Sequence, residues 1–79
     1  MELSTKLKAV RQKEGLTQME FCELLGISIS TYKKQEMSLR AEVSTAVLLK
    51  ITHHPRFEKF ALWLMTDKTC TECGQVSPL

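Results

Sequence analysis

Two short segments separated by a three-residue turn constrain the fold of this chain more than any other feature. The first segment follows Thr17 and ends at Gly26, and the second follows Ser28. Thr17 and Glu20 have the Thr-x-x-Glu spacing of a capping box, in which two side chains satisfy backbone amides at the start of a helix. A helix of about eight residues is marginal alone in water, so it must pack on its neighbours. The pattern therefore predicts two short helices joined by a tight turn.

The second of these helices is predicted from Ile29 to about Met37, with Ser28 as its cap. The turn Gly26-Ile27-Ser28 contains a glycine and an apolar residue that fits between the two helices. This is the helix-turn-helix arrangement.

An amphipathic helix is predicted before this unit, from about Ser4 to Glu14, with Ser4 as its cap. Its apolar stripe lies opposite a polar face that includes Lys6 and Arg11. Gly15 follows at the position where a helix end favours a left-handed residue.

Two further helices complete a prediction of an all-α fold with five helices. A loop of residues 38–43 leads to the fourth helix, at about 44–52. Pro55 occupies the first position of the fifth helix, which runs to about Thr66.

The chain has 79 residues, which is room for one domain. We expect residues 1–66 to form a helix-turn-helix domain that ends in a helix at about 55–66, followed by an irregular or partly extended tail over 67–79. No apolar run approaches the roughly 18 residues of a membrane span, so a cytoplasmic protein without a membrane partner is expected. A large enzyme is not expected at this size, and no catalytic set or small-molecule substrate is indicated. The net charge of +2 leaves nucleic acid open as a partner.

The cysteines are few and unevenly placed. Their number is three, and an odd number argues against a disulfide framework. Cys70 and Cys73 form one Cys-x-x-Cys motif, whereas a structural zinc site needs about four ligands. We therefore expect reduced thiols, no metal and no cofactor. A small zinc protein built on Cys70 and Cys73 is the alternative.

Six consecutive apolar residues, from Phe60 to Met65, lie in the predicted fifth helix. A helix that is apolar all round must be covered on every side, and a chain this short has little material to cover it. We therefore expect a homodimer with Leu62, Trp63 and Met65 in the interface and Trp63 as its anchor. The alternative is that the tail folds back over Trp63.

Several motifs resemble a known family. The set Gly15-Leu16-Thr17-Gln18, Gly26-Ile27-Ser28 and Glu36 resembles the DNA-binding core of the Cro and phage-repressor family. Downstream stretches are similar to the small immunity (C) repressors of temperate phages of the P-two type: His54-Pro55-Arg56-Phe57, Leu62-Trp63-Leu64-Met65-Thr66 and Gly74-Gln75-Val76-Ser77-Pro78. The resemblance implies a one-domain dimeric repressor that maintains lysogeny by blocking an early lytic promoter. The alternatives are a Cro-like or antitoxin-type regulator of the same fold, and an interaction module that binds no DNA.

The resemblance also implies a DNA-binding site, in which the third helix enters the major groove and the second crosses the backbone. Hydroxyls of Ser30 and Thr31 are expected at base edges, and Ile29 at a thymine methyl. Gln18 is expected to donate to a phosphate. The full expected set is Thr17, Gln18, Ser28, Ile29, Ser30, Thr31, Lys33 and Lys34.

The family pattern further pairs Arg11 with Glu36, which would hold the recognition helix against the first helix. The alternative for this pair is two unrelated surface charges. Lys33 and Lys34 have the alternative of a solvated helix face, and Ile29 that of simple surface packing. Tyr32 is either a core residue between the two helices or a residue that stacks on a base.

Overall fold

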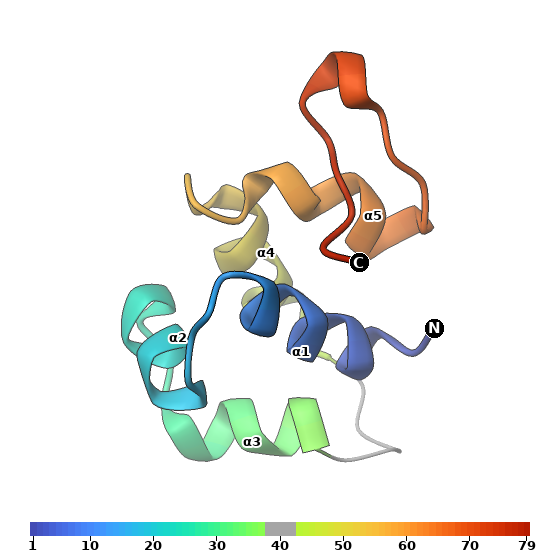
Figure 1. Cartoon of the computed structure of the whole chain (residues 1–79). Helices are drawn as coiled ribbons and strands as arrows, with labels where there is room; N and C mark the ends of the chain where they lie inside the picture. Colours follow the sequence, from blue (N-terminus) through green and yellow to red (C-terminus); the bar gives the residue numbers. More distant parts are fainter. Residues whose placement is uncertain (38–42) are drawn as a thin grey trace.

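The computed structural model describes residues 1–37 and 43–79, so most of the predicted 38–43 loop lies outside the described residues. Over these residues the chain forms five α-helices and two short 3₁₀ helices, and the predicted all-α fold is confirmed. The α-helix α1 lies across the middle of the molecule, with α2 and α3 on one side and α4 and α5 on the other (Figure 1). The elements are α1 (Leu3–Lys13), α2 (Gln18–Leu25), α3 (Ile29–Met37), α4 (Thr45–His53), η1 (Glu58–Phe60), α5 (Ala61–Thr66) and η2 (Thr71–Cys73).

The turn between α2 and α3 forms as predicted. The Glu20 amide donates to Thr17 Oγ1 at 3.1 Å, and the Thr17 amide donates to Glu20 Oε1 at 2.9 Å, so the capping box is complete. Gly26 ends α2 with φ at 69°, a left-handed conformation that strains residues with a side chain. Ser28 Oγ then accepts the Thr31 amide at 3.2 Å and caps α3.

The start of α1 differs from the prediction in two respects. The N-cap is Glu2, without a side-chain hydrogen bond, and Ser4 is a buried residue of the first turn. Lys6, which was expected on the polar face, is only 4% exposed. Its ammonium donates to the carbonyls of Trp63 at 3.0 Å and Leu64 at 3.1 Å, and lies 2.6 Å from a carboxylate oxygen of Asp67. Because these oxygens replace water around the charge, a lysine is tolerated inside the contact between α1 and α5.

The core centres on aromatic rings from three segments. The Phe21 ring meets Tyr32 edge-on at a centroid distance of 5.3 Å and Phe57 at 4.9 Å. Such edge-to-face pairs add stability beyond the area that they bury. Tyr32 is fully buried, so its core role is confirmed and it is not a base-stacking residue.

The predicted helix from Pro55 to Thr66 is wrong in its first half. The chain forms a turn at 55–57 and the 3₁₀ helix η1, and α5 begins only at Ala61. Phe57 (φ −112°, ψ −8°) keeps a right-handed helical conformation, whereas Phe60 (φ −102°, ψ 2°) leaves the α-helical region of backbone space. Both rings are buried in the core, and their packing accounts for the interruption of the helix.

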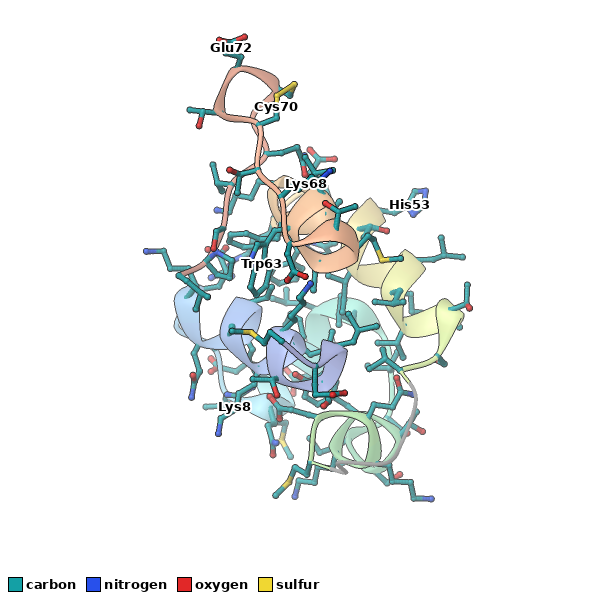
Figure 2. The ribbon with its side chains drawn as sticks, turned by 90° about the vertical axis from the view of Figure 1, so that its right-hand side faces the viewer. Lys8, His53, Trp63, Lys68, Cys70 and Glu72 are labelled. Carbon is teal, nitrogen blue, oxygen red and sulfur yellow. A yellow bond between two sulfur atoms is a disulfide. The ribbon has the colours of Figure 1, made fainter. Side chains whose placement is uncertain are left out.

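Trp63 is covered within the single chain, so the expectation that it needs a partner molecule to cover it does not hold. The side chain is 5% exposed, and the Lys6 ammonium lies 5.2 Å from its ring centroid. Figure 2 shows Trp63 on the side of α5 that faces α1. Of the other two predicted interface residues, Met65 is 61% exposed and Leu62 is half-buried.

The tail over 67–79 forms a projecting hairpin whose last residues return to the helices, so it has more regular structure than the predicted irregular or partly extended tail. Asp67 ends α5 in a left-handed conformation with φ at 63°. The Val76 amide donates to the Lys59 carbonyl at 2.8 Å, and Pro78 is buried. Cys70 and Gln75 form an isolated antiparallel β-bridge.

The expectation of three reduced thiols is also wrong for two of the cysteines. Cys70 and Cys73 are joined by a disulfide, whereas Cys22 is a free, buried thiol. The turn of η2 brings the two Cα atoms to 5.2 Å, which is within the range that a disulfide bridges.

The Lys6–Asp67 pair predicts a pH-dependent contribution to stability. The hydrogen bond from Lys6 lowers the pKa of Asp67 below its usual value. A carboxyl group with a lowered folded-state pKa contributes stability above its unfolded pKa, and this contribution is lost as the pH falls through the folded pKa. We expect Asp67→Asn to lower the melting temperature at about pH 7 and to match the wild type near about pH 2. Melting curves followed by circular dichroism test this, and an unchanged difference at both pH values would contradict it.

Candidate nucleic-acid interface

The first turn of α3 presents a cluster of hydroxyl groups. Ser28, Ser30 and Thr31 are all exposed. Ser28 Oγ donates to Thr31 Oγ1 at 2.7 Å and lies 3.4 Å from Ser30 Oγ. The cap of α3 therefore also orients the hydroxyls that were predicted to meet base edges. Ile29 beside them is half-buried and packs partly against the core.

Lys33 and Lys34 are exposed on the next turn of α3. Neither lysine forms an ion pair within the part of the chain that the structure describes. Two ammonium groups without a carboxylate partner beside a hydroxyl cluster give this end of α3 a positive, hydrogen-bonding surface. Such a surface suits the phosphates and base edges of DNA.

The start of α2 only partly fits its prediction. Thr17 is exposed and forms the capping box, so its hydroxyl already accepts the Glu20 amide at the start of α2. The Gln18 side chain, in contrast, donates to Glu36 Oε2. The nearly buried Glu36 carboxylate thus holds the Gln18 amide in the structure, and the expected phosphate contact of Gln18 stays a prediction.

Glu36 connects three helices beneath this surface. Its side chain is 2% exposed, and Oε1 accepts hydrogen bonds from Arg11 Nε at 2.9 Å and from the Tyr32 hydroxyl at 3.1 Å. Burial and the neighbouring carboxylate raise the pKa of Tyr32 well above its usual range. The predicted partners Arg11 and Glu36 are thus in contact, and a second Arg11 nitrogen donates to the Leu16 carbonyl at 2.9 Å. These bonds fix α3 against α1 and against the segment between α1 and α2.

Known proteins match the chain over this same region. The helix-turn-helix family matches residues 7–56, which extend from α1 past the end of α4. The chain is also 33% identical over 76 residues to Repressor protein C of Escherichia phage P2, and the match covers 96% of this chain and 76% of the phage protein. The chain belongs to the helix-turn-helix family of phage C repressors. Members of this group are DNA-binding transcriptional repressors.

One residue beside the repressor's hydroxyl cluster was not predicted from the sequence. Lys50 on α4 reaches across to the turn, where its ammonium donates to the Gly26 carbonyl at 3.3 Å. Lys50, Ser28, Thr31 and Ser44 line part of a hollow of about 310 Å³ between α3 and α4. No local pattern could have identified Lys50, because the contact joins residues 24 positions apart.

Neither a membrane span nor a metal site is found within the described residues of the repressor. None of its helices there is long and apolar enough to cross a membrane. The same residues contain no group of three or more His, Cys, Asp or Glu side chains that could hold a metal ion.

Proposed function

We propose that this protein represses transcription by occupying operator DNA, with the start of α3 in the major groove and α2 across the backbone. The observation that carries the proposal is the hydroxyl and lysine surface of α3, which the Glu36 hydrogen bonds hold in a fixed orientation. Ser30 and Thr31 would meet base edges, and Lys33 and Lys34 would meet phosphates or guanine. The likeness to Repressor protein C supports a role in maintaining lysogeny by silencing an early lytic promoter.

The proposed mechanism is binding alone. A repressor that covers a promoter excludes the polymerase without any reaction, so we assign no catalytic residue, cofactor or small-molecule substrate. The operator lies on phage DNA inside the bacterial host, so the proposed location is the host cytoplasm.

We further propose that the repressor acts as a homodimer. One recognition helix contacts few base pairs, whereas two such helices set roughly 34 Å apart read successive major grooves. The exposed Met65 and the half-buried Leu62 on α5 are the proposed contacts, and Trp63 is excluded because it lies in the core. In this proposal residues 1–66 carry DNA binding and dimerisation, and residues 67–79 form the tail.

Footprinting on the DNA that flanks the gene is the decisive experiment for the function. A repressor protects discrete sites that overlap a promoter, and its affinity falls steeply with salt because counterions are released on binding. Protection of a different promoter from the early lytic one would favour the Cro-like or antitoxin-type alternative. Absence of any protected site, with binding that does not depend on salt, would contradict DNA-based repression.

The lysines of α3 give a specific prediction. We expect Lys33→Ala and Lys34→Ala to weaken operator binding and leave the melting temperature unchanged, because both side chains are exposed. Loss of one phosphate contact lowers the slope of log affinity against log salt by about one unit, whereas loss of a base contact relaxes sequence preference. Fluorescence anisotropy with operator DNA over a range of salt concentrations measures both effects.

Lys68→Ala is the matched control for these two variants. Lys68 is exposed and lies in the tail, on the far side of α1 from α3 (Figure 2). The control makes the same change in net charge at a position away from the proposed groove contact. Equal losses of affinity in all three variants would show a general charge effect and remove Lys33 and Lys34 from the site.

A further inference from the structure

The tail carries an exposed disulfide at the end of a projecting hairpin. Figure 1 shows this hairpin extending away from the five helices, and Figure 2 shows the sulfur–sulfur bond near its tip. Cys73 is exposed and Cys70 is half-buried. Cys70 and Gln75 close the hairpin through two backbone hydrogen bonds of 2.9 Å, one in each direction. The disulfide is thus accessible from solvent, and its Cys70 is hydrogen-bonded directly to Gln75.

Gln75 connects this hairpin to α5. Its Oε1 accepts the Leu62 amide at 2.9 Å, and its Nε2 donates to the Glu58 carbonyl at 3.0 Å. The N-cap of α5, Phe60, makes no side-chain hydrogen bond. Gln75 therefore supplies the side-chain cap that the start of α5 lacks locally. Since α5 has only six residues, it depends on such contacts to stay helical.

We propose that Cys70 and Cys73 form a thiol–disulfide switch that controls how firmly the tail caps α5, and through α5 the dimer and its operator binding. The inference rests on the proposed function, which places the protein in the host cytoplasm. Disulfides are rare in that compartment, and those of ordinary bacteria are usually transient and catalytic or redox-sensing. A disulfide on an exposed hairpin is in the position that an exchange partner needs.

The reducing partner is a dithiol, and the exchange is balanced in electrons and protons. A thiolate of the dithiol attacks the more exposed sulfur, Cys73 Sγ, and the bond to Cys70 Sγ breaks. Cys70 leaves as a thiolate and takes up a proton. The second thiol of the partner then attacks the mixed disulfide and releases Cys73, which also becomes a thiol. The protein gains two electrons and two protons, and the dithiol is oxidised to its own disulfide.

Reduction breaks the disulfide that closes the hairpin covalently. Only backbone hydrogen bonds then hold the turn together. Those within the turn run from the Cys73 amide to the Cys70 carbonyl at 3.0 Å and from the Gly74 amide to the Thr71 carbonyl at 3.1 Å. A small isolated hairpin is only marginally stable in water. Gln75 is therefore held less firmly against Leu62 after reduction, and the start of α5 loosens. Met65, the proposed dimer contact, lies on that same helix.

The test compares oxidised and reduced wild-type protein with EDTA present throughout, so that no metal bound by free thiols contributes. We expect reduction by dithiothreitol to lower the melting temperature by roughly 5 to 10 °C. Hydrogen exchange of the Leu62 amide should become faster, and operator affinity should fall several-fold. The variant Cys70→Ser/Cys73→Ser should behave as the reduced wild type and should not respond to dithiothreitol.

Gln75→Ala tests the route from the disulfide to α5. The variant keeps both cysteines but lacks the side chain that caps Leu62. Its Leu62 amide should exchange quickly in both redox states, so the redox response at α5 should be lost. A redox response of Leu62 as large as that of the wild type would overturn the proposed route.

Other outcomes overturn the switch as a whole. Free thiols at Cys70 and Cys73 after oxidation, detected by alkylation and mass spectrometry, would do so. Equal Leu62 exchange in oxidised and reduced wild type would also do so. If neither redox state binds operator DNA, the proposed function fails, while Leu62 exchange and the dimer fraction in sedimentation still decide whether the switch exists.

Discussion

Arg11→Met is expected to lower the free energy of unfolding by about 3 to 5 kcal/mol, because it leaves the buried carboxylate of Glu36 without its cationic partner. The Glu36 side chain is only 2% exposed, so water cannot replace the lost Nε–H donor. The substitution also removes the hydrogen bond to the Leu16 carbonyl. Because domains of this size are stable by about 5 to 15 kcal/mol, the loss is a large fraction of the total. Urea denaturation followed by circular dichroism measures it.

A double-mutant cycle separates the charge effect from the loss of packing. Glu36→Gln removes the buried negative charge, so Arg11→Met/Glu36→Gln should be less destabilised than the sum of the two single variants. Arg56→Met is the matched control, since Arg56 pairs with Glu14 at the surface and its side chain is 43% exposed. The control should lose less than about 1 kcal/mol. Equal losses for Arg11→Met and Arg56→Met would contradict the role assigned to the buried pair.

Operator binding by Arg11→Met should fall as well, in conditions where the variant is still folded. Arg11 lies on α1, outside the hydroxyl and lysine surface of α3, and through Glu36 it fixes the orientation of α3. A recognition helix that varies in orientation meets base edges less often in the correct geometry. The loss should therefore be larger for operator DNA than for non-specific DNA, and competition experiments with both DNAs measure the ratio.

The parts of the fold that the sequence predicted correctly are those specified by local contacts. The capping box of Thr17 and Glu20, the left-handed Gly26 and the Ser28 cap each involve residues within three or four positions of one another. The bounds of α2 and α3 follow from them. The pairing of Arg11 with Glu36 is a long-range contact, and it was expected only because the family resemblance implied it.

The parts that were predicted incorrectly depend on contacts between distant segments. Lys6 looked like a surface lysine because its partners, the carbonyls at the end of α5, lie 57 and 58 positions away. The interruption before Ala61 arises from the burial of the Phe57 and Phe60 rings, which helical periodicity alone cannot reveal. The hydrogen bond of Gln18 to Glu36 also joins distant segments, 18 positions apart, whereas the phosphate contact expected of Gln18 stays a prediction. In each case a buried or partly buried partner from another segment outweighed the local pattern.

Trp63 is the clearest case of a residue whose contacts with distant segments the local pattern did not reveal. Its truncation to alanine is the second large effect that we expect. Trp63→Ala should lower the free energy of unfolding by about 3 to 5 kcal/mol, since removing a buried aromatic side chain leaves a cavity. It also removes the ring against which the Lys6 ammonium lies. The variant should lose helical circular dichroism at lower urea concentrations than the wild type, whether the protein is monomeric or dimeric.

Met65→Ala is the matched comparison, because Met65 lies two positions further along the same helix but is 61% exposed. Its effect on the stability of the single chain should stay within about 0.5 kcal/mol, as for most surface substitutions. If α5 forms the dimer interface, however, Met65→Ala should sediment as a monomer at concentrations where the wild type is dimeric. It should also bind the full operator more weakly, because two linked half-sites are then no longer engaged together. A dimer that survives Met65→Ala but dissociates on Trp63→Ala without loss of stability would contradict both assignments, since it would place the tryptophan and not the methionine at the interface.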